Sequence, residues 1–63
     1  MIDEFTLEIL LKKYGLDISK VLKKSTNILT YGEYVDIDKA LNYLINVLNI
    51  NKKILKNVLV YYI

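Results

Sequence analysis

The stretch that decides the fold is Tyr14–Leu29, with the sequence YGLDISKVLKKSTNIL. Gly15 follows a run of residues that favour helices, and glycine accepts the left-handed backbone conformation in which many helices end. Asp17 stands where its carboxylate can accept hydrogen bonds from the first free N–H groups of a new helix. Leu16 and Val21 flank this cap at the spacing of a hydrophobic staple. The stretch therefore predicts a helix end, a tight turn and a second helix.

Residues 18–29 are amphipathic, because apolar side chains recur on one helical face and lysines lie on the opposite face. A weaker copy of the stretch returns as residues 48–63, LNINKKILKNVLVYYI. An offset of 34 residues pairs the cap Asp17 with Asn51, and past the cap an offset of 33 pairs Lys20 with Lys53. A two-helix unit that recurs at this period is typical of α-helical repeats.

Four predicted helix starts share one pattern, an apolar residue followed by Asp or Asn, at Ile2–Asp3, Leu16–Asp17, Val35–Asp36 and Ile50–Asn51. We expect helices over about residues 4–14, 18–29, 37–48 and from 52 onward, with a loop around Gly32. Proline is absent and no segment alternates like a strand. The sequence thus predicts one all-α domain over residues 1–63, with four short helices as two helix-turn-helix repeat-like units.

The predicted core consists of the apolar faces of these helices. On the first helix the face is Leu7, Leu10, Leu11 and Tyr14. The other helices add Ile18, Val21, Leu22, Ile28, Leu29, Ile37, Leu41, Leu44, Ile45, Leu48, Ile54, Leu55, Val58, Leu59 and Tyr62. Tyr31 and Tyr34 flank Gly32, and we expect them to cover the core, with contact to a partner as the alternative.

The chain lacks two of the residue types that most often carry catalysis. Cys and His are both absent, which excludes disulfides, the usual zinc sites and the Ser-His and Cys-His nucleophile arrangements. Glu33, Asp36 and Asp38 cluster in the sequence but lack the spacing of a calcium loop. Acids near helix starts are better explained by the positive end of the helix dipole. We therefore expect a protein that is not an enzyme and uses no cofactor or metal.

Apolar residues are in surplus for so short a chain. They make up 54% of 63 residues, and the mean hydropathy is +0.27. A chain of this size buries only about 60% of the surface that its unfolded form exposes. The surplus therefore predicts a small interaction module covered by a second copy or a protein partner. On the first helix Phe5 and Ile9 form a second apolar stripe, and the chain ends in an apolar tail. The protein-contact candidates are Phe5, Ile9, Tyr61, Tyr62 and Ile63.

No segment predicts a membrane span. The longest strongly apolar run, residues 40–50, is about half the ~20 residues that a transmembrane helix needs. The N-terminus begins acidic, without the basic region of a secretory signal. Binding flat on a membrane surface is disfavoured, since no Trp is present to anchor at the interface. We expect a cytoplasmic protein.

The lysines suggest an alternative function. The chain has nine lysines, no arginine and a net charge of +2. If the two units stack in parallel, one set of lysines forms a stripe that follows a phosphate backbone. A solvated helix face is the competing interpretation. The nucleic-acid candidates are Lys20, Lys23, Lys24, Lys53 and Lys56.

The segment LEILLKKYGLDISKVLKKSTNIL, residues 7–29, resembles a repeat of the mitochondrial transcription termination factor family. Such a repeat has a leucine-rich helix, a Gly-Leu turn, a capped helix and a short third helix opened by proline. Gly15–Leu16 matches the turn, Leu22 and Ile28–Leu29 match the apolar positions, and Thr26 and Leu59 stand at the proline position. The resemblance covers most of the chain. It implies a curved helical-repeat fold that binds double-stranded nucleic acid along a basic concave face.

Overall fold

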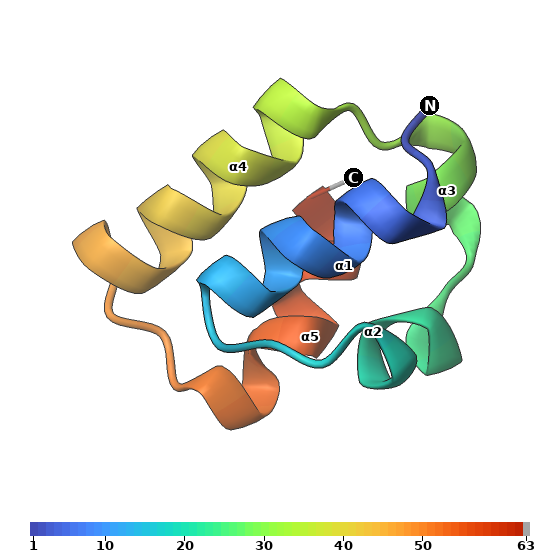
Figure 1. Ribbon diagram of the computed structural model, residues 1–63. Coiled ribbons are helices and arrows are strands. Elements are labelled where there is room, and N and C mark those ends of the chain that lie inside the picture. The colour runs from blue at the N-terminus through green and yellow to red at the C-terminus, as the bar shows by residue number, and fades with distance from the viewer. Residues whose placement is uncertain (63) are drawn as a thin grey trace.

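The computed structural model describes residues 1–62, apart from the side chains of Val60 and Tyr62. Over this range the chain forms α-helices joined by short turns, with one π-helical turn (Figure 1). They are α1 (Glu4–Lys13), α2 (Ile18–Lys24), α3 (Asn27–Tyr31), α4 (Tyr34–Asn42), η1 (Tyr43–Val47) and α5 (Lys52–Tyr62). The described residues contain no strand. The prediction of an all-α fold is confirmed.

Helix α1 supplies the centre of the core. Figure 1 shows α1 in front of α5 and beside α4, which runs in a similar direction. Leu7, Leu10 and Leu11 are at most 1% exposed, as the apolar face predicted. Fully burying a leucine side chain stabilises the fold by roughly 1.5–3 kcal/mol. The remaining core residues come from every other element and are Ile2, Leu16, Val21, Ile28, Ile37, Leu41, Leu44, Leu55 and Leu59.

Three of the four predicted caps are confirmed. The Asp3 carboxylate accepts a hydrogen bond from the Thr6 N–H at 2.8 Å, and the Asp17 carboxylate accepts one from the Ser19 N–H at 3.0 Å. The Asn51 side-chain oxygen accepts one from the Lys53 N–H at 2.8 Å. Each bond satisfies an N–H group that has no partner inside its helix.

The fourth predicted cap, Asp36, is wrong. Helix α4 begins at Tyr34, so Asp36 lies in its first turn and Glu33 occupies the cap position. The Glu33 side chain makes no capping bond, because its carboxylate pairs with the ammonium group of Met1. The Glu33 carbonyl accepts the first regular bond of the helix, from the Ile37 N–H at 2.9 Å.

The predicted second helix, residues 18–29, is broken in two. Helix α2 ends at Lys24, Ser25 is extended, and α3 begins at Asn27. The Ser25 hydroxyl accepts a hydrogen bond from the Asn27 N–H at 3.1 Å. Ser, Thr and Asn side chains compete in this way for backbone groups that a helix would use. The break leaves Ile28 only 1% exposed.

The loop predicted around Gly32 consists only of Gly32 and Glu33. Gly32 donates a backbone hydrogen bond to the Ile28 carbonyl at 2.9 Å. A β-carbon at Gly32 would meet that carbonyl oxygen and would lie 2.8 Å from the Ile37 Cδ1 atom. Tyr31 and Tyr34 are 71% and 46% exposed, so the prediction that they cover the core is wrong.

Two residues of the last two predicted helices are more exposed than expected, one just after the π-helical turn and one on α5. Leu48 and Ile54 were expected in the core but are 47% and 50% exposed. The Leu48 N–H bonds to the Tyr43 carbonyl, five residues back, at 3.0 Å. This wider turn rotates the residues that follow it away from the face expected for an α-helix. On α5, Leu55 and Leu59 are fully buried one turn apart and Ile54 lies outside their stripe.

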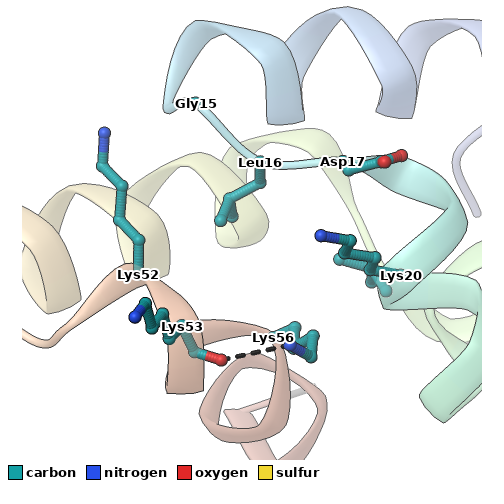
Figure 2. A pocket seen from close by; sticks show the side chains of 8 residues that line it. Gly15, Leu16, Asp17, Lys20, Lys52, Lys53 and Lys56 are labelled. Atoms are coloured by element: carbon teal, nitrogen blue, oxygen red, sulfur yellow. Dashed lines mark hydrogen bonds between the residues drawn. The ribbon is translucent and has the colours of Figure 1, made fainter.

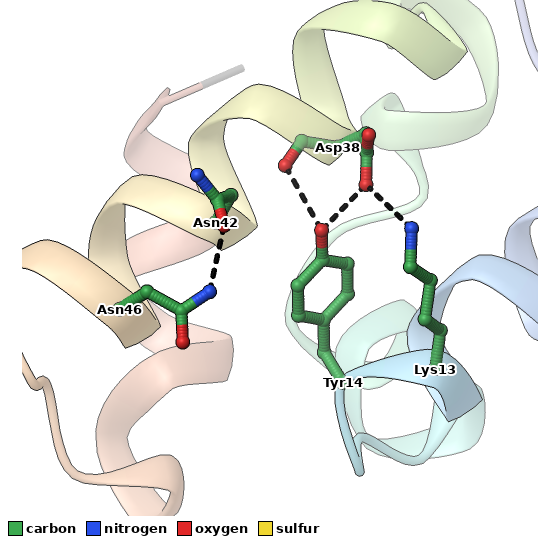
Figure 3. Close-up of polar contacts among 5 residues, drawn as sticks. All are labelled: Lys13, Tyr14, Asp38, Asn42 and Asn46. Carbon is green, nitrogen blue, oxygen red and sulfur yellow. Dashed lines mark hydrogen bonds and ion pairs between the residues drawn. The ribbon is translucent and has the colours of Figure 1, made fainter.

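A polar contact joins α1 to α4. The Tyr14 hydroxyl donates a hydrogen bond to the Asp38 carboxylate at 2.6 Å, and the Lys13 ammonium lies 3.6 Å from the same oxygen (Figure 3). The hydrogen bond to Asp38 raises the pKa of Tyr14 to about 12. It also holds the pKa of the Asp38 carboxyl below its usual value, with a smaller contribution from Lys13. The sequence indicated Tyr14 only as an apolar-face residue, so this contact was not predicted.

The substitution Gly32→Ala should lower the free energy of unfolding by about 1–3 kcal/mol, because the added methyl group enters a closely packed space. Urea denaturation followed by circular dichroism measures this change. Thr30→Ala, at an exposed position of α3, is the control and should change it by less than about 0.5 kcal/mol. Equal effects of the two substitutions would contradict the close contact.

The raised pKa of Tyr14 makes the stability depend on pH in alkali. A tyrosine whose pKa is higher in the folded state contributes stability that is present below pH ~10 and is lost as pH approaches about 12. The variant Tyr14→Phe should be less stable than wild type at neutral pH. Its free energy of unfolding should fall less than that of wild type as the pH rises from ~10 to about 12. Urea midpoints across this range test the prediction, with Tyr61→Phe, at an 89% exposed residue, as the control. Parallel curves for wild type and Tyr14→Phe would contradict it.

Candidate functional site

A pocket of about 400 Å³ lies between the turn after α1 and the helices α2 and α5 (Figure 2). The turn contributes one wall, and the two helices, which pack against each other, contribute the others. Half of the lining residues are lysines. The lining residues are Gly15, Leu16, Asp17, Lys20, Val21, Lys52, Lys53 and Lys56.

The turn after α1 has the geometry that its sequence predicted. Gly15 has a φ of +76°, in the left-handed region. The Leu16 N–H donates to the Leu11 carbonyl at 2.9 Å and closes the end of α1. Leu16 and Val21 are 9% and 1% exposed, so the apolar floor of the pocket is also part of the core.

The turn before α5 has a similar construction. Asn49 has a φ of 53°, and it stands 34 residues after Gly15, at the offset found in the sequence. The Ile50 N–H donates to the Leu44 carbonyl at 2.9 Å, and Asn51 then caps α5 as Asp17 caps α2. The two turns place the first residues of α2 and α5 on either side of the pocket.

The pocket has a surplus of positive charge. Four lysines line it, against one acid, Asp17. Among the described residues the ion pairs are Met1 with Glu33 and Lys13 with Asp38, so no lining lysine has a carboxylate partner. The Lys56 ammonium donates instead to the Lys53 carbonyl at 3.1 Å.

The one acid of the pocket is already engaged. One Asp17 carboxylate oxygen accepts hydrogen bonds from the Ser19 hydroxyl at 2.8 Å and the Ser19 N–H at 3.0 Å. These two bonds lower the pKa of the Asp17 carboxyl, and the nearby charges of Lys20 and Lys12 lower it further. Asp17 is therefore ionised at neutral pH and is held toward the start of α2.

The structure brings together three of the five nucleic-acid candidates. Lys20, Lys53 and Lys56 line the pocket, although they come from helices that are distant in sequence. Lys23 and Lys24 are exposed in the last turn of α2 and do not line it. Lys52 completes the pocket and was not predicted as a site residue. Its position directly after the Asn51 cap was the available signal.

The protein-contact candidates that the structure describes are exposed. On α1, Phe5 is 71% and Ile9 is 55% exposed, and Tyr61 on α5 is 89% exposed. The side chain of Tyr62 and all of Ile63 lie outside the described residues. Other large apolar side chains are exposed as well, at Met1, Tyr31, Tyr34, Val35, Tyr43, Val47, Leu48 and Ile54.

Within residues 1–62 no three acidic side chains come together as a metal site would require. No described helix is long and apolar enough to cross a membrane. Protein-family models, curated proteins and solved structures were compared with the chain, and none of them matches it. The described residues present two candidate surfaces, the lysine-lined pocket and the exposed apolar stripe of α1.

The backbone at Gly15 generates a prediction about the pocket wall. Gly15→Ala should lower the free energy of unfolding by roughly 1–2 kcal/mol, because a β-carbon strains a residue with positive φ. The new β-carbon would also approach the Lys52 ammonium at 2.8 Å, but this flexible chain end can move away. Gly15→Asn should cost less, since Asn tolerates the left-handed region. Urea denaturation compares the two variants, and an equal cost would contradict strain as the cause.

Proposed function

We propose that the protein is a non-enzymatic helical interaction module that associates with a second copy of itself through α1. The observation that carries the proposal is the balance of apolar side chains in the described residues. Eleven large hydrophobic residues are exposed, against twelve that form the core. A soluble monomer leaves single apolar residues exposed, whereas a surface this rich in them is typical of an interaction site.

The outer side of α1 is the best placed of these surfaces. Phe5 and Ile9 lie one helical turn apart on the side opposite the buried leucines. In Figure 1 α1 lies at the front, and no other helix covers it. Because the inner side of α1 is buried in the core, the backbone that carries Phe5 and Ile9 is already ordered before binding.

The charges of α1 favour a second copy as the partner. Glu4 lies in the first turn, while Lys12 and Lys13 lie in the last turn. Two α1 helices that pair in antiparallel orientation place the acidic end of each against the basic end of the other. A symmetric dimer pairs one surface patch with the same patch of its partner. The complementary ends set the register of the pair, and the stripe supplies the apolar contact.

The size of the molecule is compatible with such an interface. The exposed surface of the described protein is 4267 Å². A stable interface covers about 800 Å² of each partner, which is roughly a fifth of this surface. Phe5 and Ile9 would form its centre, and the flanking Glu8 and Lys12 would form part of its rim. The tail candidates Tyr61, Tyr62 and Ile63 stay predictions and are not needed for this pairing.

Nucleic-acid binding, as implied by the lysine stripe and by the resemblance to the mitochondrial transcription termination factor family, stays a prediction. Three of its candidate lysines share one pocket, whereas Lys23 and Lys24 lie outside that pocket. Both described residues of the α1 stripe, by contrast, lie on one face of one helix. We therefore base the proposed function on this stripe.

The double variant Phe5→Ala/Ile9→Ala tests the proposal. It should weaken self-association about 100-fold or more, because each side chain contributes roughly 1.5–3 kcal/mol when buried and 1.4 kcal/mol is tenfold in affinity. Sedimentation equilibrium over a range of protein concentrations measures the change. The fold should be retained, since both side chains are exposed and alanine favours helices.

The matched control is Val47→Ala/Leu48→Ala, which removes apolar surface at the end of η1, from residues that are 59% and 47% exposed. It should leave the association constant within about twofold of wild type. A wild-type protein that stays monomeric at millimolar concentration would contradict self-association. A control variant that dissociates as readily as the α1 variant would contradict the choice of face.

A further inference from the structure

We propose that the pocket between the Gly15 turn, α2 and α5 binds an oligophosphate, an anion of two or more linked phosphates. The proposal concerns a different surface from the α1 stripe and does not depend on self-association. It begins from the convergence of Lys20 on α2 with Lys52, Lys53 and Lys56 on α5 around one cavity.

The lysines of the pocket outnumber its acids and form no ion pair among the described residues. Four positive charges face one aspartate, which leaves a surplus of three. None of the four ammonium groups has a carboxylate within 4.0 Å among the described residues. Like charges gathered around a cavity repel one another, and the walls of a cleft strengthen the field inside it. An anion of several charges would remove this repulsion on binding.

Two of the pocket lysines have close neighbours within the protein. The Lys56 ammonium donates a hydrogen bond to the Lys53 carbonyl at 3.1 Å, and this bond limits the movement of the Lys56 side chain. At Gly15 a β-carbon would lie 2.8 Å from the Lys52 ammonium, so the glycine leaves room for that ammonium beside the turn. Figure 2 shows Lys20 reaching from α2 toward the side of the pocket that holds Lys53 and Lys56.

The residue types in the pocket define the ligand class. Lysine provides point charges and lacks the planar pair of donors with which arginine reads a base. No aromatic residue lines the pocket, so a base has no surface on which to stack. The Gly15 and Leu16 N–H groups already bond to the Lys12 and Leu11 carbonyls. The site therefore offers charge in place of base recognition.

The amount of charge favours linked phosphates over a single phosphate. One phosphate carries about two negative charges near neutral pH, fewer than the surplus of three. A triphosphate carries enough negative charge to neutralise the pocket. The cavity of about 400 Å³ falls in the usual range for small-molecule sites and is large enough for a short phosphate chain.

Isothermal titration calorimetry of the full chain with sodium triphosphate, at low ionic strength, tests the proposal. We expect saturable binding at one site per chain. Lys20→Gln/Lys53→Gln should weaken it about tenfold or more, because two charge-assisted contacts are lost. Lys23→Gln/Lys24→Gln makes the same change in net charge outside the pocket, and it should leave the affinity within about twofold of wild type.

The variant Asp17→Asn provides an independent test in the opposite direction. Asn caps a helix about as well as Asp, so α2 should be retained while the one negative charge of the pocket is removed. Triphosphate should then bind several-fold more tightly. Circular dichroism confirms that each variant is folded before its affinity is interpreted.

Four results would overturn the proposal. The first is no heat of binding and no saturable change in the amide NMR spectrum at millimolar triphosphate. The second is equal weakening by the two double-lysine variants, which would mean attraction to net charge alone. The third is that the protein binds a DNA duplex but shows no saturable binding of triphosphate, and that both double-lysine variants weaken the duplex binding equally. Stronger binding of triphosphate than of orthophosphate would support the proposal, and equal binding of the two would contradict it.

Discussion

Leu7, Leu10 and Leu11 of α1 pack at the centre of a cluster of twelve buried apolar residues drawn from every element, and the other helices are arranged around this contact. The chain has no cysteine or histidine with which to add a disulfide or a zinc site. Its stability therefore rests on burial, on helix caps and on the Tyr14–Asp38 hydrogen bond between α1 and α4. A core this small cannot cover the remaining apolar side chains, because surface grows relative to volume as a domain shrinks. The exposed stripe of α1 follows from the same constraint.

Much of this fold could be predicted from the sequence, because its signals are local. Asp3, Asp17 and Asn51 cap helices through bonds that span two or three residues. One failure arose where a distant group decided a local choice. Glu33 makes no capping bond because it pairs with Met1, from which α1, α2 and α3 separate it along the chain. The π-helical turn at residues 43–47 changed which side chains face inward, and helical periodicity alone does not predict such a turn.

The pocket could be predicted only in part, for a related reason. A helical wheel indicates the face on which a lysine lies, but it does not indicate whether another helix crosses opposite that lysine. Lys20 and Lys23 share a predicted face, yet only Lys20 lies opposite α5 at the pocket. The second turn is what brings α5 there, through the left-handed Asn49 and the cap Asn51. The Tyr14–Asp38 contact was missed because both residues already had simpler explanations, as a core residue and as an acid near a helix start.

The two proposed surfaces meet at the end of α1. Lys12 lies in the last turn of α1, on the rim of the stripe, and its charge also acts on Asp17 at the edge of the pocket. In the antiparallel pairing proposed above, Lys12 faces the acidic end of the second copy, which would supply it with a counter-charge. That counter-charge would reduce the positive potential at the pocket and thus the affinity for an anion. Coupling between two binding events is reciprocal, so an anion held beside Asp17 would in turn weaken the pairing. Because Lys12 is exposed, solvent screens both interactions and keeps this antagonism small.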